Sequence, residues 1–159
     1  MILEYEEKYA EEVKDLLVEL QEYIVSIDKD GYNIITEDYR EEYFKKTIEE
    51  VSKFNGKIFL YEEKSKIVGM IAGVVNSEET DTYDYKGPKT GRVTELVVTK
   101  SVRSKGIGKK LLNHMEQYLK SIGCRDILIG VFAYNENAKK FYEKNGYGTR
   151  MLDVRKNGI

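Results

Sequence analysis

The residues best suited to chemistry form a basic, glycine-containing segment between an apolar strand and a long amphipathic helix. Residues 103–108 follow an R-x-x-G-x-G pattern, and Lys109 comes next. The start of a helix offers backbone N–H groups that lack acceptors, together with the positive end of the helix dipole. Gly106 and Gly108 let these amides approach a ligand without a Cβ in the way. The segment is therefore predicted to bind phosphate, with Arg103 and Lys105 adding charge.

Two common phosphate-binding motifs do not fit this segment. The P-loop pattern G-x-x-x-x-G-K-[ST] fails because Lys110 follows Lys109 and no glycine lies five positions before Gly108. The dinucleotide pattern G-x-G-x-x-G fails because Leu111 occupies the position of the third glycine. Taken alone, the hexapeptide is equally compatible with a solvated basic loop.

The elements that position this segment follow from apolar periodicity and turn residues, which predict one domain over residues 1–159 with the order β-α-α-β-β-β-α-β-α-β. The predicted strands are 2–5, 58–61, 67–75, 92–98, 127–132 and 152–155, and the predicted helices are 13–24, 36–55, 107–122 and 135–145. Thr36 is expected to cap the second helix. An antiparallel meander followed by β-α-β-α units predicts an α/β fold, with an α+β mixed sheet and helices on both faces.

The composition excludes several classes of protein. Cys124 is the only cysteine and His114 the only histidine, which excludes a disulfide framework and a cysteine- or histidine-rich metal cluster, so no metal is expected. We expect Cys124 to be a small buried residue and His114 to be a partly buried or surface histidine rather than a base. The apolar runs are far shorter than the ~20 residues that span a membrane. We therefore expect no membrane partner and a cytoplasmic location.

A second pattern, N-x-x-A-x-x-F-Y-x-x-x-G-Y, covers residues 135–147. Together with L-x-V at 96–98 and R-x-x-G-x-G at 103–108, it resembles the GNAT superfamily of N-acetyltransferases. The matching residues are Leu96, Val98, Arg103, Gly106, Gly108, Asn135, Ala138, Phe141, Tyr142, Gly146 and Tyr147. The predicted element order is similar to the GNAT fold over nearly the whole chain. The resemblance implies an acyl-CoA N-acyltransferase that moves an acetyl group from acetyl-CoA to a primary amine by direct attack on the thioester.

The resemblance also implies where acetyl-CoA binds. Its pyrophosphate is expected at the amides of the glycine segment, and its pantetheine arm beside strand 92–98, where the family's sheet parts from the strand at 127–132. The implied cofactor-binding residues are Leu96, Val97, Val98, Arg103, Ser104, Lys105, Gly106, Ile107, Gly108, Lys109 and Asn135.

Two residues are implied to act in catalysis. Tyr142 resembles the family tyrosine that protonates the departing thiolate, and a phenol with pKa near ~10 remains a donor at neutral pH. Glu95 could take the amine proton through water, while the Val98 amide could stabilise the oxyanion. The alternatives are that Tyr142 only packs within its helix and that Glu95 pairs with Arg92 or Lys100.

The acceptor is expected to be a cationic amine, such as a polyamine, an aminoglycoside or a lysine-containing peptide. The segments that usually shape its pocket, about 20–40 and 76–90, contain carboxylates and aromatics, which suit a cation. These residues are Tyr23, Asp28, Asp30, Tyr32, Glu78, Glu79, Asp81, Tyr83, Asp84 and Tyr85. A solvated acidic surface is the alternative.

The distribution of charge supports two binding sides. Residues 1–55 carry 16 acidic and 7 basic residues, whereas residues 89–159 carry 6 acidic and 15 basic ones, so the net charge of −2 is a cancellation. The basic part coincides with the expected phosphate site and contains no nucleic-acid-binding motif, so we expect no nucleic-acid partner. A homodimer stays open, as does the alternative function of a non-catalytic acyl-CoA-binding or regulatory module.

Overall fold

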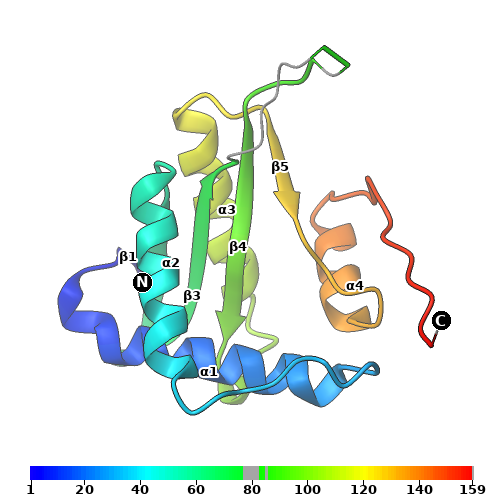
Figure 1. Ribbon diagram of the computed structural model, residues 1–159. Helices are drawn as coiled ribbons and strands as arrows, with labels where there is room; N and C mark the ends of the chain where they lie inside the picture. The colour runs from blue at the N-terminus through cyan, green and yellow to red at the C-terminus, as the bar shows by residue number, and fades with distance from the viewer. Residues whose placement is uncertain (77–82, 85, 159) are drawn as a thin grey trace.

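The computed structural model describes residues 1–76, 83–84 and 86–158 and shows a five-stranded mixed sheet with strands in chain order (Figure 1). The strands are β1 (Ile2–Glu4), β2 (Lys57–Glu63), β3 (Lys66–Val75), β4 (Thr90–Val98) and β5 (Asp126–Ile129). The first four pair antiparallel, and β5 pairs parallel to β4. Helices pack on both faces, which confirms the predicted α/β class with a mixed sheet.

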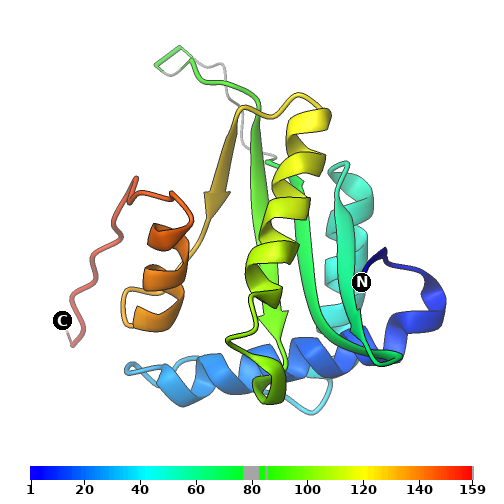
Figure 2. The same ribbon diagram turned by 180° about the vertical axis from the view of Figure 1, so that it is seen from behind.

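Two helices cover one face of the sheet and one helix covers the other. Helices α1 (Ala10–Ile27) and α2 (Tyr39–Lys53) pack on β3, and α3 (Ile107–Ser121) packs on the opposite face against β2, β3 and β4 (Figures 1 and 2). Helix α4 (Glu136–Lys144) lies beyond β5, at the open side of the sheet (Figure 1). Single 3₁₀ turns at Glu7–Tyr9 and Lys100–Val102 precede α1 and the loop into α3.

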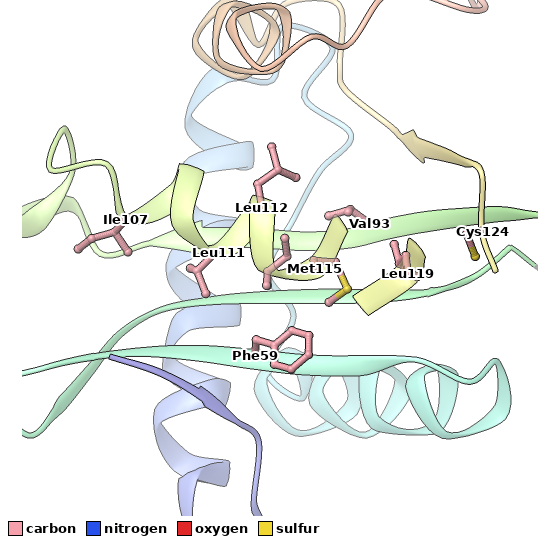
Figure 3. Packing of buried hydrophobic residues seen from close by; sticks show 9 residues of the cluster. Phe59, Val93, Ile107, Leu111, Leu112, Met115, Leu119 and Cys124 are labelled. Atoms are coloured by element: carbon pink, nitrogen blue, oxygen red, sulfur yellow. The ribbon is translucent and has the colours of Figure 1, made fainter. Parts of the chain in front are cut away.

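The core has two parts because the sheet is buried on both faces. Helix α3 presents a stripe of buried residues at helical spacing toward β2 and β4 (Figure 3). That stripe is Ile107, Leu111, Leu112, Met115 and Leu119. On the other face, residues of α1 such as Leu17 pack with Leu60, Met70 and Val97.

Strand glycines allow α3 to lie close to the sheet. A Cβ built on Gly73 would lie 2.6 Å from Sδ of Met115, and one on Gly91 would lie 2.7 Å from Cδ1 of Leu119. Real side chains do not approach that closely, so a larger residue at either position would require the Met115 or Leu119 side chain to move.

A β-bulge at Thr94 changes which face the side chains of β4 point to. The register passes from Gly73↔Val93 to Ala72↔Glu95, so Thr94 is an extra residue on β4. Val93 joins the core on the α3 side, whereas Val97 joins the core on the α1 side. Without the bulge, residues 93 and 97 would share a face, because strand neighbours alternate. The bulge therefore turns Glu95 toward α1 and α2.

Three expected features of the fold differ in the structure. Helix α2 begins at Tyr39, and Asp38 rather than Thr36 occupies its N-cap position, because Thr36 takes part in a turn in which its carbonyl accepts the Tyr39 N–H. Strand β5 ends at Ile129 rather than 132. The last strand expected at 152–155 is not formed, since this segment lies as exposed coil and Arg155 contacts the loop after α1.

Candidate active site

The backbone of β4 is exposed beside the point where β5 leaves the sheet. The β4–β5 pairing ends at Val93↔Ile129. The Thr99 N–H donates to the Val68 carbonyl on β3 at 2.9 Å. Because such pairs alternate along an antiparallel ladder, Leu96 and Val98 turn their N–H and C=O groups away from β3, toward the gap left by β5.

The three residues expected to contact pantetheine are therefore placed differently. Leu96 and Val98 present backbone groups to the gap, whereas Val97 pairs with β3 and its side chain is buried in the core. The Val98 carbonyl already accepts a 2.7 Å hydrogen bond from Nε of Arg103. An extended ligand with amide groups could pair with the remaining polar groups of this edge.

A cavity of about 410 Å³ opens where β4 and β5 separate. Helices α1, α2 and α4 contribute to its walls together with the two strands. Its lining residues are Leu20, Gln21, Ile24, Asn33, Tyr39, Tyr43, Val93, Thr94, Glu95, Leu96, Ile129, Gly130, Val131, Phe132, Asn135, Ala138 and Tyr142. Both predicted catalytic residues thus line one cavity at the exposed edge of β4.

Glu95 is a buried carboxylate whose partner comes from α2. The Tyr43 hydroxyl donates a 2.6 Å hydrogen bond to Oε1 of Glu95, a partner that neither the catalytic prediction nor the alternative of an ion pair with Arg92 or Lys100 included. The pKa of Glu95 is raised to about 7. Burial is the largest cause of the rise, the hydrogen bond from Tyr43 opposes it, and the charge of Glu50 adds to it. A carboxyl group in this range can exchange a proton near neutral pH.

Tyr142 lies on α4 with its ring packed edge-on against Phe141 and Tyr147. Burial, and then the negative charge of Glu95, raises the pKa of Tyr142 to about 12. None of the described residues accepts a hydrogen bond from its hydroxyl. Tyr142 therefore combines the packing role with a protonated hydroxyl at the cavity.

The glycine segment forms the start of α3, as expected. Gly106 is the N-cap with φ 77°, a left-handed conformation that favours glycine, and Ser104 before it has φ 67°. The first-turn amides of Ile107, Gly108 and Lys109 have no acceptor within the helix. A methyl group added at Gly106 would meet no protein atom within 4 Å. This open cradle of amides fits a pyrophosphate group.

The charges around the cradle are partly paired. The Nζ atom of Lys105 lies 3.5 Å from a carboxylate oxygen of Glu63, and Lys109 is exposed beside it in the first turn of α3. Both side chains remain solvent-accessible, so they can reorient toward a phosphate at little cost.

The Arg103 side chain turns toward α1. Its Nη2 lies 3.5 Å from Oε1 of Glu19, and its guanidinium lies 5.6 Å from the centre of the Tyr23 ring. The same Glu19 oxygen accepts the Lys100 backbone N–H at 2.8 Å. Glu19 was not predicted, because a glutamate on a helix surface carries no signal in the sequence that it pairs with a loop 81 residues away.

Asn135 fastens the start of α4. Its Oδ1 accepts the Ala138 backbone N–H at 3.2 Å, as an N-cap, and also accepts the Tyr23 hydroxyl at 3.2 Å. The side chain is buried while lining the cavity. Asn135 thus links α1 to the helix that carries Tyr142.

The acidic residues expected to bind the acceptor are mostly engaged in the loop after α1. Asp28 accepts hydrogen bonds from the backbone and side chain of Asn33 and from the Tyr134 hydroxyl, which hold its pKa well below its usual range. Asp30 lies 3.7 Å from Arg155. Tyr83 is fully exposed. The expected Glu78, Glu79, Asp81 and Tyr85 lie outside the described residues.

The single cysteine lies in the packed core, and the single histidine is half-buried beside it. The His114 ring packs edge-on to Phe59 with 4.4 Å between ring centres. Cys124 is buried, and burial raises the pKa of its thiol, which disfavours a nucleophilic thiolate. Over the described part of the chain, no group of three or more histidine, cysteine or acidic residues is arranged to hold a metal. Among the described helices, none is long and apolar enough to cross a membrane.

Comparison with known proteins adds a family and several relatives. The family described as "Acetyltransferase (GNAT) family" matches residues 19–147. Glucosamine 6-phosphate N-acetyltransferase from Arabidopsis thaliana is 24% identical over 126 residues, which cover 79% of this chain and 83% of that protein.

Solved structures agree in fold. A mutant of the BH1408 protein from Bacillus halodurans superposes with a TM-score of 0.86 at 20% identity, covering 100% of this chain and 99% of that one. The aminoglycoside N-acetyltransferase AAC(6')-Iy, solved in complex with CoA, has a TM-score of 0.69 at 15% identity and covers 99% of this chain and 100% of that one.

Proposed function

Because the chain belongs to the GNAT acetyltransferase family, we propose that it transfers an acetyl group from acetyl-CoA to a primary amine that enters the site as a cation. One observation carries the proposal. Glu95 and Tyr142, a carboxylate and a phenol with shifted pKa values, line the same cavity at the exposed edge of β4. This pairing of a proton acceptor with a proton donor is what transfer to an amine requires.

The residues around the gap fit acetyl-CoA. The amides at the start of α3 would hold its pyrophosphate, with Lys105 and Lys109 adding charge, and the backbone edge at Leu96 and Val98 would pair with the pantetheine arm. When bound, acetyl-CoA supplies the acetyl group as a thioester. AAC(6')-Iy, which shares this fold, was solved in complex with CoA, which supports CoA as the ligand.

Glu95 prepares the amine. An alkylamine with pKa near ~10.4 is almost entirely protonated at pH 7 and cannot attack until it loses a proton. With a pKa of about 7, Glu95 is partly ionised at neutral pH and accepts this proton, directly or through a water. The Tyr43 hydroxyl steadies the carboxylate by donating to it.

Tyr142 serves the leaving group. Its raised pKa keeps the hydroxyl protonated at neutral pH, so it can donate the proton to the departing sulfur. The Asn135 cap holds α4, and hence Tyr142, at the cavity.

The test has two steps. Isothermal titration with CoA should show saturable binding at micromolar ligand, and a panel of primary amines with acetyl-CoA should release free thiol. Absence of CoA binding would overturn the proposal. Tight CoA binding without thiol release from any amine would instead favour an acyl-CoA-binding module.

A further inference from the structure

The cavity carries a single charge. Of its seventeen described lining residues, Glu95 is the only one with a charged side chain, and the other polar ones are neutral amides or hydroxyls. Lys46 acts on Glu95 through its charge but does not line the cavity. An anionic group placed here would therefore be desolvated beside a carboxylate, with no described cation lining the cavity to pair with it.

Three carboxylates near the cavity, those of Asp28, Asp30 and Glu19, already have partners. Both oxygens of Asp28 accept hydrogen bonds from the loop after α1, including the Tyr32 N–H at 2.8 Å and the Asn33 N–H at 2.7 Å. Asp30 faces Arg155, and Glu19 faces Arg103. A second ammonium group on the acceptor would have to compete with these partners.

The remaining walls are uncharged and combine apolar, aromatic and neutral polar side chains. Leu20 and Ile24 from α1 and Ile129, Val131 and Phe132 from β5 and the loop after it line the cavity. On the α2 side, Tyr39 and Tyr43 stack with 4.9 Å between ring centres, which fixes the aromatic surface next to Glu95. Such walls suit an uncharged body and offer no ionic partner to a second charged group.

We propose that the acceptor is a primary amine carried on an otherwise uncharged body, and that the cavity rejects amines bearing phosphate or carboxylate groups. This inference rests on the proposed function and adds the substrate class. It separates the chain from its Arabidopsis thaliana relative, whose name gives glucosamine 6-phosphate as its substrate. The energetic reason is that the amine has one carboxylate to meet, whereas an anionic group has no partner.

Matched pairs of amines test the inference. With acetyl-CoA present, kcat/KM from thiol release is measured for 2-phenylethylamine against phenylalanine, which adds only a carboxylate, and for glucosamine against glucosamine 6-phosphate. Spermidine probes a polycation. Titration of each amine into the CoA-bound protein gives binding independent of turnover. We expect 2-phenylethylamine to exceed phenylalanine at least 100-fold, glucosamine to exceed its phosphate at least tenfold, and spermidine to fall below 2-phenylethylamine.

A charge variant sharpens the test. Gln21→Lys places a cation on the cavity wall and should reduce the discrimination against phenylalanine at least tenfold, whereas Glu12→Gln, on the exposed face of the same helix, should leave it unchanged. Equal or higher kcat/KM for the anionic member of either pair, or for spermidine, overturns the inference while leaving the acetyltransferase function intact. CoA binding with no binding of either 2-phenylethylamine or glucosamine also overturns it. Loss of CoA binding would overturn the proposed function itself.

Discussion

The Tyr43 hydroxyl lies 2.6 Å from Oε1 of Glu95 and joins α2 to β4 across 52 residues of sequence. The bond holds a buried carboxylate in place at the cavity without adding a positive charge. Because the partner is neutral, burial dominates, and the pKa of Glu95 stays raised to about 7.

Activity should therefore depend on the ionisation of Glu95. If it accepts the amine proton, kcat/KM rises with pH through about 7, as the carboxyl loses its proton. This pKa already includes the effects of Tyr43, Lys46 and Glu50. Glu95→Gln should lower kcat about 100-fold and remove this rise. The pH profile of thiol release measures both. A variant that keeps the same rising limb would assign it to another group.

The free energy of unfolding should also depend on the ionisation of Glu95, but it should fall with pH where activity rises. The pKa of Glu95 is higher in the folded protein than its ordinary 4.5, so the folded state holds the proton longer, and the free energy of unfolding falls as pH rises from about 4.5 to about 7. Glu95→Gln should remove this fall. The free energy of unfolding of the variant minus that of wild type should therefore be up to about 3 kcal/mol higher at pH 8 than at pH 4.5. Urea unfolding at the two pH values checks this, with Glu12→Gln as the exposed control.

Tyr142→Phe should reduce kcat about 100-fold and leave the Kd for CoA within about twofold, because it removes only the hydroxyl. Tyr147→Phe is the matched control: its hydroxyl donates to Glu116 at 2.7 Å, and its ring packs on Tyr142. Thiol release and titration with CoA separate the two effects. Equal kcat in wild type and Tyr142→Phe would reject Tyr142 as the acid.

Gly106→Ala should weaken CoA binding at least tenfold. The added methyl group meets no protein atom, and its space is where we propose the pyrophosphate lies. The left-handed backbone costs the alanine variant about 1 kcal/mol of stability. Gly123→Ala, at the other end of α3 with φ 92°, carries the same strain and should leave CoA affinity unchanged. Titration with CoA measures the affinity of both variants, and urea unfolding measures their stability. Equal losses of CoA affinity in the two variants would mean that backbone strain alone is responsible.

Asn135→Ala should destabilise α4, whereas Asn135→Asp should retain the cap. Loss of the Oδ1 acceptor for the Ala138 N–H costs about 1 kcal/mol, and aspartate is an equally good N-cap. Because α4 carries Tyr142, kcat should fall in the alanine variant and recover in the aspartate variant. Urea unfolding and thiol release measure the two. A low kcat in both variants would point to a direct contact of the amide with the cofactor.

The sequence predicted the features that depend on local pattern. The glycine segment does begin α3, and the apolar stripe from Ile107 to Leu119 does form one half of the core. Leu96 and Val98 lie at the expected gap, since residues two apart on a strand share an orientation. The family assignment rested on the same local patterns.

Features that depend on distant partners were missed or wrong. The partner of Glu95 on β4 comes from helix α2, and the bulge at Thr94 that turns this carboxylate toward α2 leaves no mark in the apolar pattern. The strand expected at 152–155 alternates correctly but forms no sheet pairing. The N-cap at Thr36 failed because the chain makes another turn before α2 starts. The dimer, the single domain and the cytoplasmic location stay predictions.

Helix α1 contains none of the motifs found in the sequence, yet it contacts both the loop before α3 and the start of α4. Glu19 pairs with the loop that carries the glycine segment, and Tyr23 bonds to Asn135 at the start of α4. Leu20 and Ile24 of the same helix form part of the cavity wall. A substitution of Leu20 or Ile24 that changes the acceptor therefore alters a helix that also contacts the proposed cofactor-binding loop. We expect such a substitution to change acceptor preference and CoA affinity together, because α1 contacts both the loop of the glycine segment and the start of α4.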